Sequence, residues 1–241
     1  GLIRRERGVA MLVSPDDPAG RLAYHYAEKV RIAAAAAATV NDGETVMIEA
    51  GSCCALLAEQ ISIQRTGITI VTNSAFIAQR LGAHPMVSTV LLGGEQQHDS
   101  RVLVGPMVEL CARQFIVDRL FIGTDGFTPS LGFTARDYMR ATAVRALASR
   151  AERVVVLTES EKLGGHGPVP LLGADDVAAL WTDSAAPDAQ VDALTGAGVE
   201  VVTVAADGTA AVHPAQARPE PDHVVGRDSG PTALTTREEP S

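Results

Sequence analysis

The sequence predicts an α/β domain whose mainly parallel sheet is flanked by helices. Three observations predict it: short apolar runs alternate with helical stretches, the runs are rich in Val, Ile and Leu, and they are apolar on both faces. Strands buried beneath helices on both sides have this composition, and strand–helix alternation is typical of a parallel sheet. With 46% hydrophobic residues among 241, the chain can build one large core.

The elements follow one another from residue 21. The first helix is expected over residues 21–39, where Leu22, Tyr26 and Val30 recur at four-residue spacing before a run of alanines. Strands are expected, from their Val, Ile and Leu content, at residues 45–48, 68–71, 87–92, 119–122, 154–157, 177–181 and 199–204. Helices are expected between them at residues 53–63, 75–82, 106–115, 137–151 and 187–197.

The two ends of the chain differ from this pattern. Residues 1–20 are expected to be a linker, because the stretch 14–18 reads Ser-Pro-Asp-Asp-Pro, which is typical of loops. Residues 205–241 hold five of the 13 prolines, no aromatic residue and one leucine, so we expect a disordered tail. The folded domain is therefore expected at residues 21–204.

Composition excludes several classes of function. The 20 basic against 29 acidic residues give a net charge of −9, which argues against a broad basic face for nucleic acid. Three cysteines and six histidines show neither a disulfide framework nor metal-ligand spacing, so we expect no metal and no cofactor. The sequence contains no apolar stretch of the ~20 residues that span a bilayer. A cytoplasmic protein is expected.

The strand-to-helix junctions are the expected ligand site, because ligands of open α/β sheets bind beyond the carboxyl ends of the strands. The first junction reads Glu49-Ala50-Gly51-Ser52-Cys53. Gly51 permits a tight turn, Ser52 can cap the helix, and the amides of the first helical turn then suit a phosphate. The junction has neither a dinucleotide nor a P-loop pattern, and an ordinary helix cap is the alternative.

Three further junctions are polar or rich in glycine. Thr72 and Asn73 follow the second strand, Gly94 lies in a glycine pair after the third, and Asp125 follows the fourth. Asp125 could bind sugar hydroxyls, act as an acid or base, or form an Asx turn. Each junction is explained by turn chemistry, but several at one edge of a sheet favour a binding crevice.

Lys162 and Cys53 stand out by residue type. The chain has 18 arginines and only two lysines, and Lys162 lies in a glycine-flanked loop. An ammonium group suits a phosphate or carboxylate, and a solvated surface lysine is the alternative. Cys53 at a helix N-terminus would have a lowered thiol pKa if it were exposed.

Taken in order, the junctions resemble a known family. The motifs are Glu28-Lys29, Asp42-Gly43-Glu44-Thr45, Glu49-Ala50-Gly51-Ser52, Val71-Thr72-Asn73-Ser74, Leu92-Gly93-Gly94, Val104-Gly105, Asp118-Arg119-Leu120-Phe121-Ile122-Gly123, Gly132-Phe133-Thr134 and Ser160-Glu161-Lys162. They resemble the effector-sensing domain of DeoR-family transcriptional regulators over about residues 4–204.

The resemblance implies a fold like that of ribose-5-phosphate isomerase and the coenzyme A transferases. It implies a phosphorylated sugar or related metabolite as effector, which modulates a winged helix-turn-helix that precedes the sensor. The effector-binding residues that it implies are Gly51, Ser52 and Cys53 around the phosphate, with Thr72, Asn73, Gly94, Asp125 and Lys162 around the remainder. A homo-oligomer is expected, because operators are commonly symmetric.

The sequence departs from the family pattern at four points. Glu49 stands where aspartate is usual, Cys53 where a hydroxyl residue is common, and Glu159 where the lysine loop usually has aspartate. These changes predict an atypical ligand or a lost one. The winged helix itself, ~55 residues in such families, is absent from this sequence, which we interpret as a fragment that reaches DNA only through the missing module.

Two other functions remain open from the residues. An isomerase on the same fold would need a carboxylate that moves a proton between adjacent carbons, and Asp125, Glu159 and Glu161 are candidates. An oligomerisation module with a vestigial pocket would bind no sugar phosphate. The regulator reading predicts a sensor without catalysis.

Overall fold

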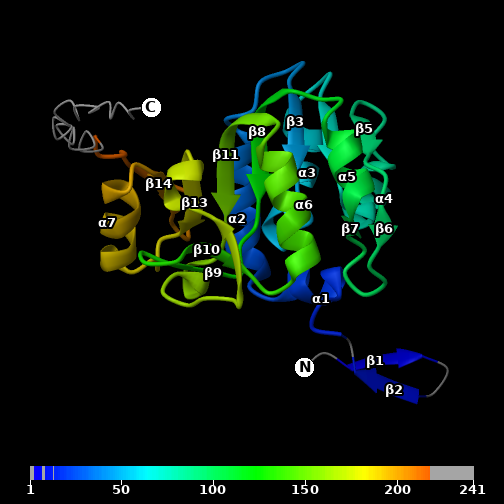
Figure 1. Cartoon of the computed structure of the whole chain (residues 1–241), viewed down its shortest axis with the longest axis horizontal. Coiled ribbons are helices and arrows are strands. Elements are labelled where there is room, and N and C mark those ends of the chain that lie inside the picture. The colour runs from blue at the N-terminus through cyan, green and yellow to red at the C-terminus, as the bar shows by residue number, and fades with distance from the viewer. Residues whose placement is uncertain (1–2, 7–8, 13, 218–241) are drawn as a thin grey trace, which may run out of the picture.

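The computed structural model describes residues 3–6, 9–12 and 14–217, and its centre is an eight-stranded sheet (Figure 1). The strand order is β15 (Ala210–His213), β14 (Glu200–Val204), β13 (Ala179–Asp183), β11 (Ala151–Leu157), β8 (Val117–Ile122), β3 (Thr45–Ile48), β4 (Thr69–Thr72) and β5 (Ser88–Leu91). Neighbouring strands are parallel except for the pair β14–β15. The predicted mainly parallel α/β sheet is confirmed.

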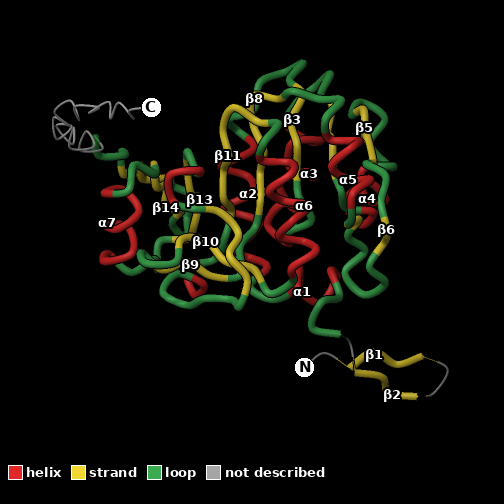
Figure 2. The backbone as a smooth tube through the Cα atoms, in the orientation of Figure 1, coloured by secondary structure: helices red, strands yellow, loops and turns green. Residues whose placement is uncertain are grey.

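Seven helices are described. They are α1 (Pro18–Ala23), α2 (Tyr26–Ala37), α3 (Ser52–Gln64), α4 (Ala75–Leu81), α5 (Pro106–Ala112), α6 (Tyr138–Ala148) and α7 (Asp188–Gly196). Buried side chains of α2, α3 and α4 form one core cluster, and those of α5, α6 and α7 form another. The two clusters lie on opposite faces of the sheet (Figure 1, Figure 2). In β3, Val46 and Ile48 face the first cluster and Met47 the second, as the two-residue period of a strand requires.

The order of the strands reverses between β3 and β8. From β3 the chain adds β4 and β5 on one side, and from β8 it adds β11, β13 and β14 on the other. Glu49 continues the ladder beyond β3, since its N–H donates to the carbonyl of Phe121 at 2.9 Å. The connections leave such a pair of strands in opposite directions, so a crevice is expected at their carboxyl ends.

The helix predicted over residues 21–39 is two helices. The chain breaks at His25, whose φ of 48° is left-handed, and α1 ends just before it. The break frees two carbonyl groups: the ammonium of Lys29 donates to the carbonyls of Arg21 and Tyr24, both at 2.6 Å. A continuous helix would have used these carbonyls internally, so the buried lysine accounts for the break.

Three short antiparallel sheets accompany the main one, all from segments not predicted as strands. One is the order β12 (Val169–Leu172), β10 (Gly132–Ala135), β9 (Gly126–Thr128), in which the rings of Phe127 and Phe133 lie 4.8 Å apart. The others are the pairs β6 (Glu95–Gln96) with β7 (Leu103–Val104), and β1 (Ile3–Glu6) with β2 (Val9–Leu12). In the view of Figure 1, α1, β9 and β10 lie below the strands of the main sheet.

Two segments differ from the expected boundaries. The hairpin β1–β2 falls within the expected linker, residues 1–20, and helix α1 begins there and extends past its end. Strand β15 falls within the expected tail, because Gly208 at φ 88° turns the chain back onto β14. Residues 218–241 of that tail lie outside the described residues. Among the described helices, none has the length and apolar character needed to cross a membrane.

Candidate functional site

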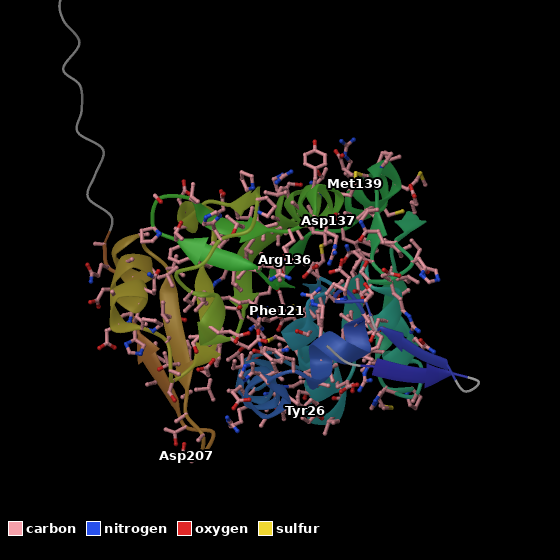
Figure 3. The ribbon with its side chains drawn as sticks, turned by 90° about the horizontal axis from the view of Figure 1, so that it is seen from below. Tyr26, Phe121, Arg136, Asp137, Met139 and Asp207 are labelled. Carbon is pink, nitrogen blue, oxygen red and sulfur yellow. The ribbon has the colours of Figure 1, made fainter. Side chains whose placement is uncertain are left out.

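Two small hollows lie on either side of Gly51, at the reversal point of the sheet. One has a volume of about 40 Å³, and the other of about 10 Å³. Both are lined by Arg21 of α1 and Gly51; the larger adds Glu49, Thr124, Asp125, Asp137 and Arg140, and the smaller Asp16, Ser52 and Ser100. Figure 3 views the molecule from below, and its labels show Asp137 beside Arg136 on the connection into α6.

Gly51 brings the ends of β3 and β8 together. It is the N-cap residue of α3, and a methyl group in place of its hydrogen would lie 3.2 Å from Cα of Gly123. A side chain at this position would therefore force its neighbours to move by a few tenths of an ångström. Ser52 begins α3 and is buried with its neighbours, so the unpaired amides of the first turn of a 13-residue helix face this junction.

Glu49 is a buried carboxylate at the same junction. Its Oε2 accepts the N–H of Gly123 at 3.2 Å. Burial raises the pKa of Glu49, while the Gly123 N–H and the charges of Arg21 and Arg140 oppose that rise. Glu49 is therefore a carboxyl group whose ionisation depends on the two arginines.

Asp125 lies where the sequence predicts. It lines the larger hollow, and its Oδ2 accepts the backbone N–H of Arg136 at 2.9 Å. This hydrogen bond ties the loop after β8 to the loop before α6. One carboxylate oxygen thus has a structural role, and the side chain still borders the hollow.

The two lysines of the chain meet at Glu159. The Lys29 ammonium, whose side chain is 2% exposed, lies 2.8 Å from Oε1, and the Lys162 ammonium lies 3.1 Å from Oε2. Lys29 also donates to two carbonyls, so its three N–H donors all have acceptors. Burial alone would raise the pKa of Glu159, but the charges of Lys162 and Lys29 outweigh it and lower the pKa to about 2.

Cys53 borders the same cluster. Its Sγ lies 3.8 Å from Oε2 of Glu159, and the side chain is buried. Burial, reinforced by the Glu159 charge, raises the pKa of Cys53 to about 12. Because the thiolate is the nucleophile, a nucleophilic role for Cys53 has no support.

We expect iodoacetamide at pH 8 to label the folded protein once, at Cys111. Cys111 is partly exposed, whereas Cys53 and Cys54 are buried and burial raises both of their pKa values. Intact-mass measurement followed by peptide mapping checks this, and the protein in urea, with three labels, is the control. Faster labelling of Cys53 than of Cys111 would contradict it.

The remaining predicted residues have framework contacts. Thr72 Oγ1 accepts the N–H of Ser74, and Asn73 Nδ2 donates to the carbonyl of Leu103 at 3.1 Å. A methyl group on Gly94 would lie 2.7 Å from the carbonyl oxygen of Val104. The Asn73 hydrogen bond ties the end of β4 to β7, and none of the three residues lines either hollow beside Gly51.

The structure adds two site residues that the junctions did not indicate, Arg21 and Arg140. Both lie on helices, and both line the larger hollow. Lys162 was the predicted cation, because lysine is rare in this chain and Lys162 lies in a glycine-flanked loop. One signal was available: Arg140 stands three residues after Asp137, whose side chain caps α6, so its position in the first turn was predictable.

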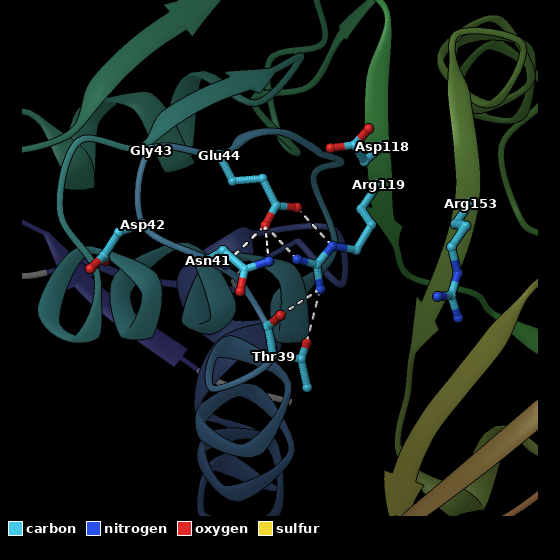
Figure 4. Close-up of a pocket in the computed structure, with 8 residues that line it drawn as sticks. All are labelled: Thr39, Asn41, Asp42, Gly43, Glu44, Asp118, Arg119 and Arg153. Carbon is cyan, nitrogen blue, oxygen red and sulfur yellow. Dashed lines mark hydrogen bonds and ion pairs between the residues drawn. The ribbon is translucent and has the colours of Figure 1, made fainter.

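A larger hollow, of about 540 Å³, lies at the opposite end of the sheet (Figure 4). Arg119 lies within it, and its guanidinium is occupied by Glu44, with Nε 2.7 Å from Oε1, and by the carbonyl of Thr39 at 2.9 Å. Asp42 and Asp118 add negative charge. Arg153 also lines the hollow of Figure 4. A fourth hollow, of about 200 Å³, is lined by four carboxylates, those of Glu28, Glu159, Glu161 and Asp183.

A family model described as the DeoR C-terminal sensor domain matches residues 24–184. The transcriptional repressor AccR of Agrobacterium fabrum is 29% identical over 189 residues, which cover 76% of this chain and 73% of that protein. The HTH-type transcriptional regulator UlaR of Shigella dysenteriae is 30% identical over 187 residues, 76% and 71% of the two chains.

Among solved structures, ribose 5-phosphate isomerase A from Methanocaldococcus jannaschii aligns with a TM-score of 0.42 and 18% identity, over 56% of this chain and 53% of that one. The β subunit of eIF2B from Chaetomium thermophilum aligns with a TM-score of 0.48 and 16% identity, over 65% and 48%.

Proposed function

The chain belongs to the family of DeoR C-terminal sensor domains, and from that premise we propose that it binds a phosphorylated sugar or a related metabolite at the Gly51 junction. Binding there would control the DNA affinity of a winged helix-turn-helix, in a cytoplasmic homo-oligomer. A sensing role in transcription regulation follows from the family. The effector class is our inference from the chemistry of the junction.

One observation carries the proposal: anion-binding and hydroxyl-binding groups converge at the reversal point of the sheet. The first turn of α3 offers backbone amides, and Arg21 and Arg140 add two guanidinium groups on the other side of the larger hollow. Glu49 and Asp125 add carboxylates, which accept hydrogen bonds from hydroxyl groups. A phosphorylated sugar presents an anion and several hydroxyls together.

The predicted residues keep their place in this proposal. Gly51, Ser52 and Cys53 form the phosphate-facing turn, and Asp125 faces the sugar. Thr72, Asn73, Gly94 and Lys162 complete the surrounding framework, with the Lys162 charge shared with Glu159. The departures at Glu49, Cys53 and Glu159 support an effector that differs from the usual one of the family.

An isomerase is the second candidate, favoured by one observation: burial raises the pKa of Glu49, as a proton-transferring carboxyl group requires. Glu159 does not serve, because its pKa is lowered to about 2. Turnover of ribose 5-phosphate by the purified protein, abolished in Glu49→Gln and in Asp125→Ala, would establish the enzyme. The family relatives are named as regulators, which favours the sensor.

We expect the correct sugar phosphate, at about 100 times its Kd, to raise the melting temperature by about 5 to 10 °C, because a ligand of the folded state adds about 2.7 kcal/mol. A thermal-shift screen of sugar phosphates checks this, with each unphosphorylated sugar as its matched control. Stabilisation by the parent sugar alone would contradict a phosphorylated effector. Failure of every sugar phosphate and related metabolite would favour a vestigial pocket.

A further inference from the structure

Arg140 is partly buried beside Gly51 and is held by a carboxylate from a distant segment. Its side chain is 13% exposed, and Nη2 lies 3.0 Å from Oδ2 of Asp16. Its Nε has no hydrogen-bond partner within the described residues, and the carboxylate of Asp137 is 3.9 Å away from it. A guanidinium that lines a hollow with a spare donor is suited to a further anionic ligand.

Asp16 belongs to the segment that joins the hairpin β1–β2 to α1. Its side chain is 43% exposed, so it reaches Arg140 from the outside of the molecule. Asp17, the next residue, caps α1 by accepting the N–H of Gly20 at 2.8 Å. Asp16, Arg21 and Ser52 line the smaller hollow together. The segment therefore forms part of the wall of the Gly51 junction.

The hollows are too small for a sugar phosphate while this segment is in place. Their volumes, about 40 and 10 Å³, hold only a few water molecules. An effector must therefore displace part of the lining. The Asp16 side chain is partly exposed and is held by its ion pair with Arg140, whereas Glu49 is buried and Arg21 lies on α1, whose end is fixed by Lys29.

We propose that Arg140 and Arg21 hold the anionic group of the effector in front of the first turn of α3, and that Asp16 occupies this site until the effector replaces it. This inference rests on the proposed function and names the residues and the competitor within that site. The carboxylate of Asp16 and the effector anion compete for the charge and the donors of the one Arg140 guanidinium. Effector entry thus releases residues 14–17, which follow the hairpin in the chain.

The lysines are poorer ligands for this anion. All three N–H donors of Lys29 already have acceptors, and Lys162 already forms an ion pair with Glu159. Competition also makes the two effects reciprocal. The factor by which a bound anion weakens the Asp16–Arg140 contact equals the factor by which that contact weakens anion binding.

Calorimetric titration of the full chain with inorganic phosphate tests the site. We expect Arg140→Gln to weaken phosphate binding about tenfold or more, because a charge-assisted pair is lost. Asp16→Asn should strengthen it about threefold, because an exposed ion pair no longer competes. Arg153→Gln, which removes the same charge from the exposed hollow of Figure 4, is the matched control and should bind as the wild type does.

Hydrogen–deuterium exchange gives the second readout. Phosphate should speed exchange in residues 14–17 of the wild type, whereas in Asp16→Asn exchange should already be fast and unaffected by phosphate. Asp16 is exposed, so this variant keeps the fold even where Arg140→Gln does not. Unchanged phosphate affinity in Asp16→Asn, or no phosphate binding to the wild type, overturns the inference.

The outcome separates this inference from the proposed function. If a sugar phosphate stabilises the wild type and both Asp16→Asn and Arg140→Gln bind it unchanged, the function stands and the competitor is refuted. If the phosphate pattern is as expected and no sugar phosphate or related metabolite binds, the anion site stands and the proposed effector class fails.

Discussion

Replacing Glu159 with alanine is expected to lower the free energy of unfolding by about 3 to 5 kcal/mol. The substitution leaves the Lys29 ammonium, 2% exposed, without its carboxylate, which lies 2.8 Å away in the wild type. It also removes the partner of Lys162. Urea denaturation followed by circular dichroism measures the change.

Two variants show whether the buried charge is the cause. Glu161→Ala removes a neighbouring, exposed carboxylate that contacts Tyr24 and His25, and it should cost less than about 1 kcal/mol. Lys29→Met combined with Glu159→Ala should recover much of the loss, because the unpaired buried charge is gone. Equal stability of Glu159→Ala and the wild type would refute this account.

The same cluster predicts how stability depends on pH. The pKa of Glu159 is lowered from 4.5 to about 2 in the folded protein, so the unfolded chain binds its proton at higher pH than the folded one. Its contribution is therefore fully present above pH 4.5 and is lost as the pH falls from there towards 2, by on the order of 3 kcal/mol. In Glu159→Gln this part of the acid denaturation profile should flatten.

Gly126→Ala is expected to cost about 3 kcal/mol, because a methyl group would meet backbone and not a movable side chain. It would lie 2.7 Å from Cα of His166 and closer still to the carbonyl oxygen of Gly165. The loop that carries Lys162 is also tied here, since Gly164 N–H donates to the carbonyl of Phe127 at 2.8 Å. Strand β9 and the loop that carries Lys162 must separate to admit the methyl group.

Gly196→Ala is the matched control in the same urea measurement. Gly196 is the last residue of α7, and a methyl group there meets nothing within 4 Å. Alanine is the better helix former, so this variant should gain up to about 1 kcal/mol. A Gly126→Ala protein as stable as the wild type would show that β9 and the Lys162 loop separate at little cost, which would contradict the close packing between them.

The main sheet was predictable because each of its central strands has a local sequence pattern that is typical of buried parallel strands. Residues 45–48 form β3 as expected, since a run of Thr, Val, Met and Ile buried on both faces favours a parallel strand. Strands β9, β10 and β12 were missed because they are short and contain glycine or proline, and because β12 pairs with β10 from a distant part of the chain. The break at His25 depends on Lys29, whose burial no local pattern predicts.

The candidate site was predictable in its location but not in its charges. The glycine junction at Gly51 follows from the rule for open sheets, whereas Arg21 and Arg140 reach it from helices. The rarity of lysine in the chain led to the prediction that Lys162 binds the effector anion, but in the structure Lys162 pairs with the protein's own Glu159. Which ion pairs form depends on distances between segments in the folded protein, and the spacing of residues within one segment does not predict these distances.

The convergence of both lysines on Glu159 has a practical consequence for handling the protein. The chain contains no other lysine side chain, and of these two, one is buried and the other is 23% exposed and paired. Reagents that acylate primary amines, including common cross-linkers and surface-coupling chemistries, will therefore find few targets besides the α-amino group. Carboxyl- or thiol-directed coupling is the better route for immobilising this protein.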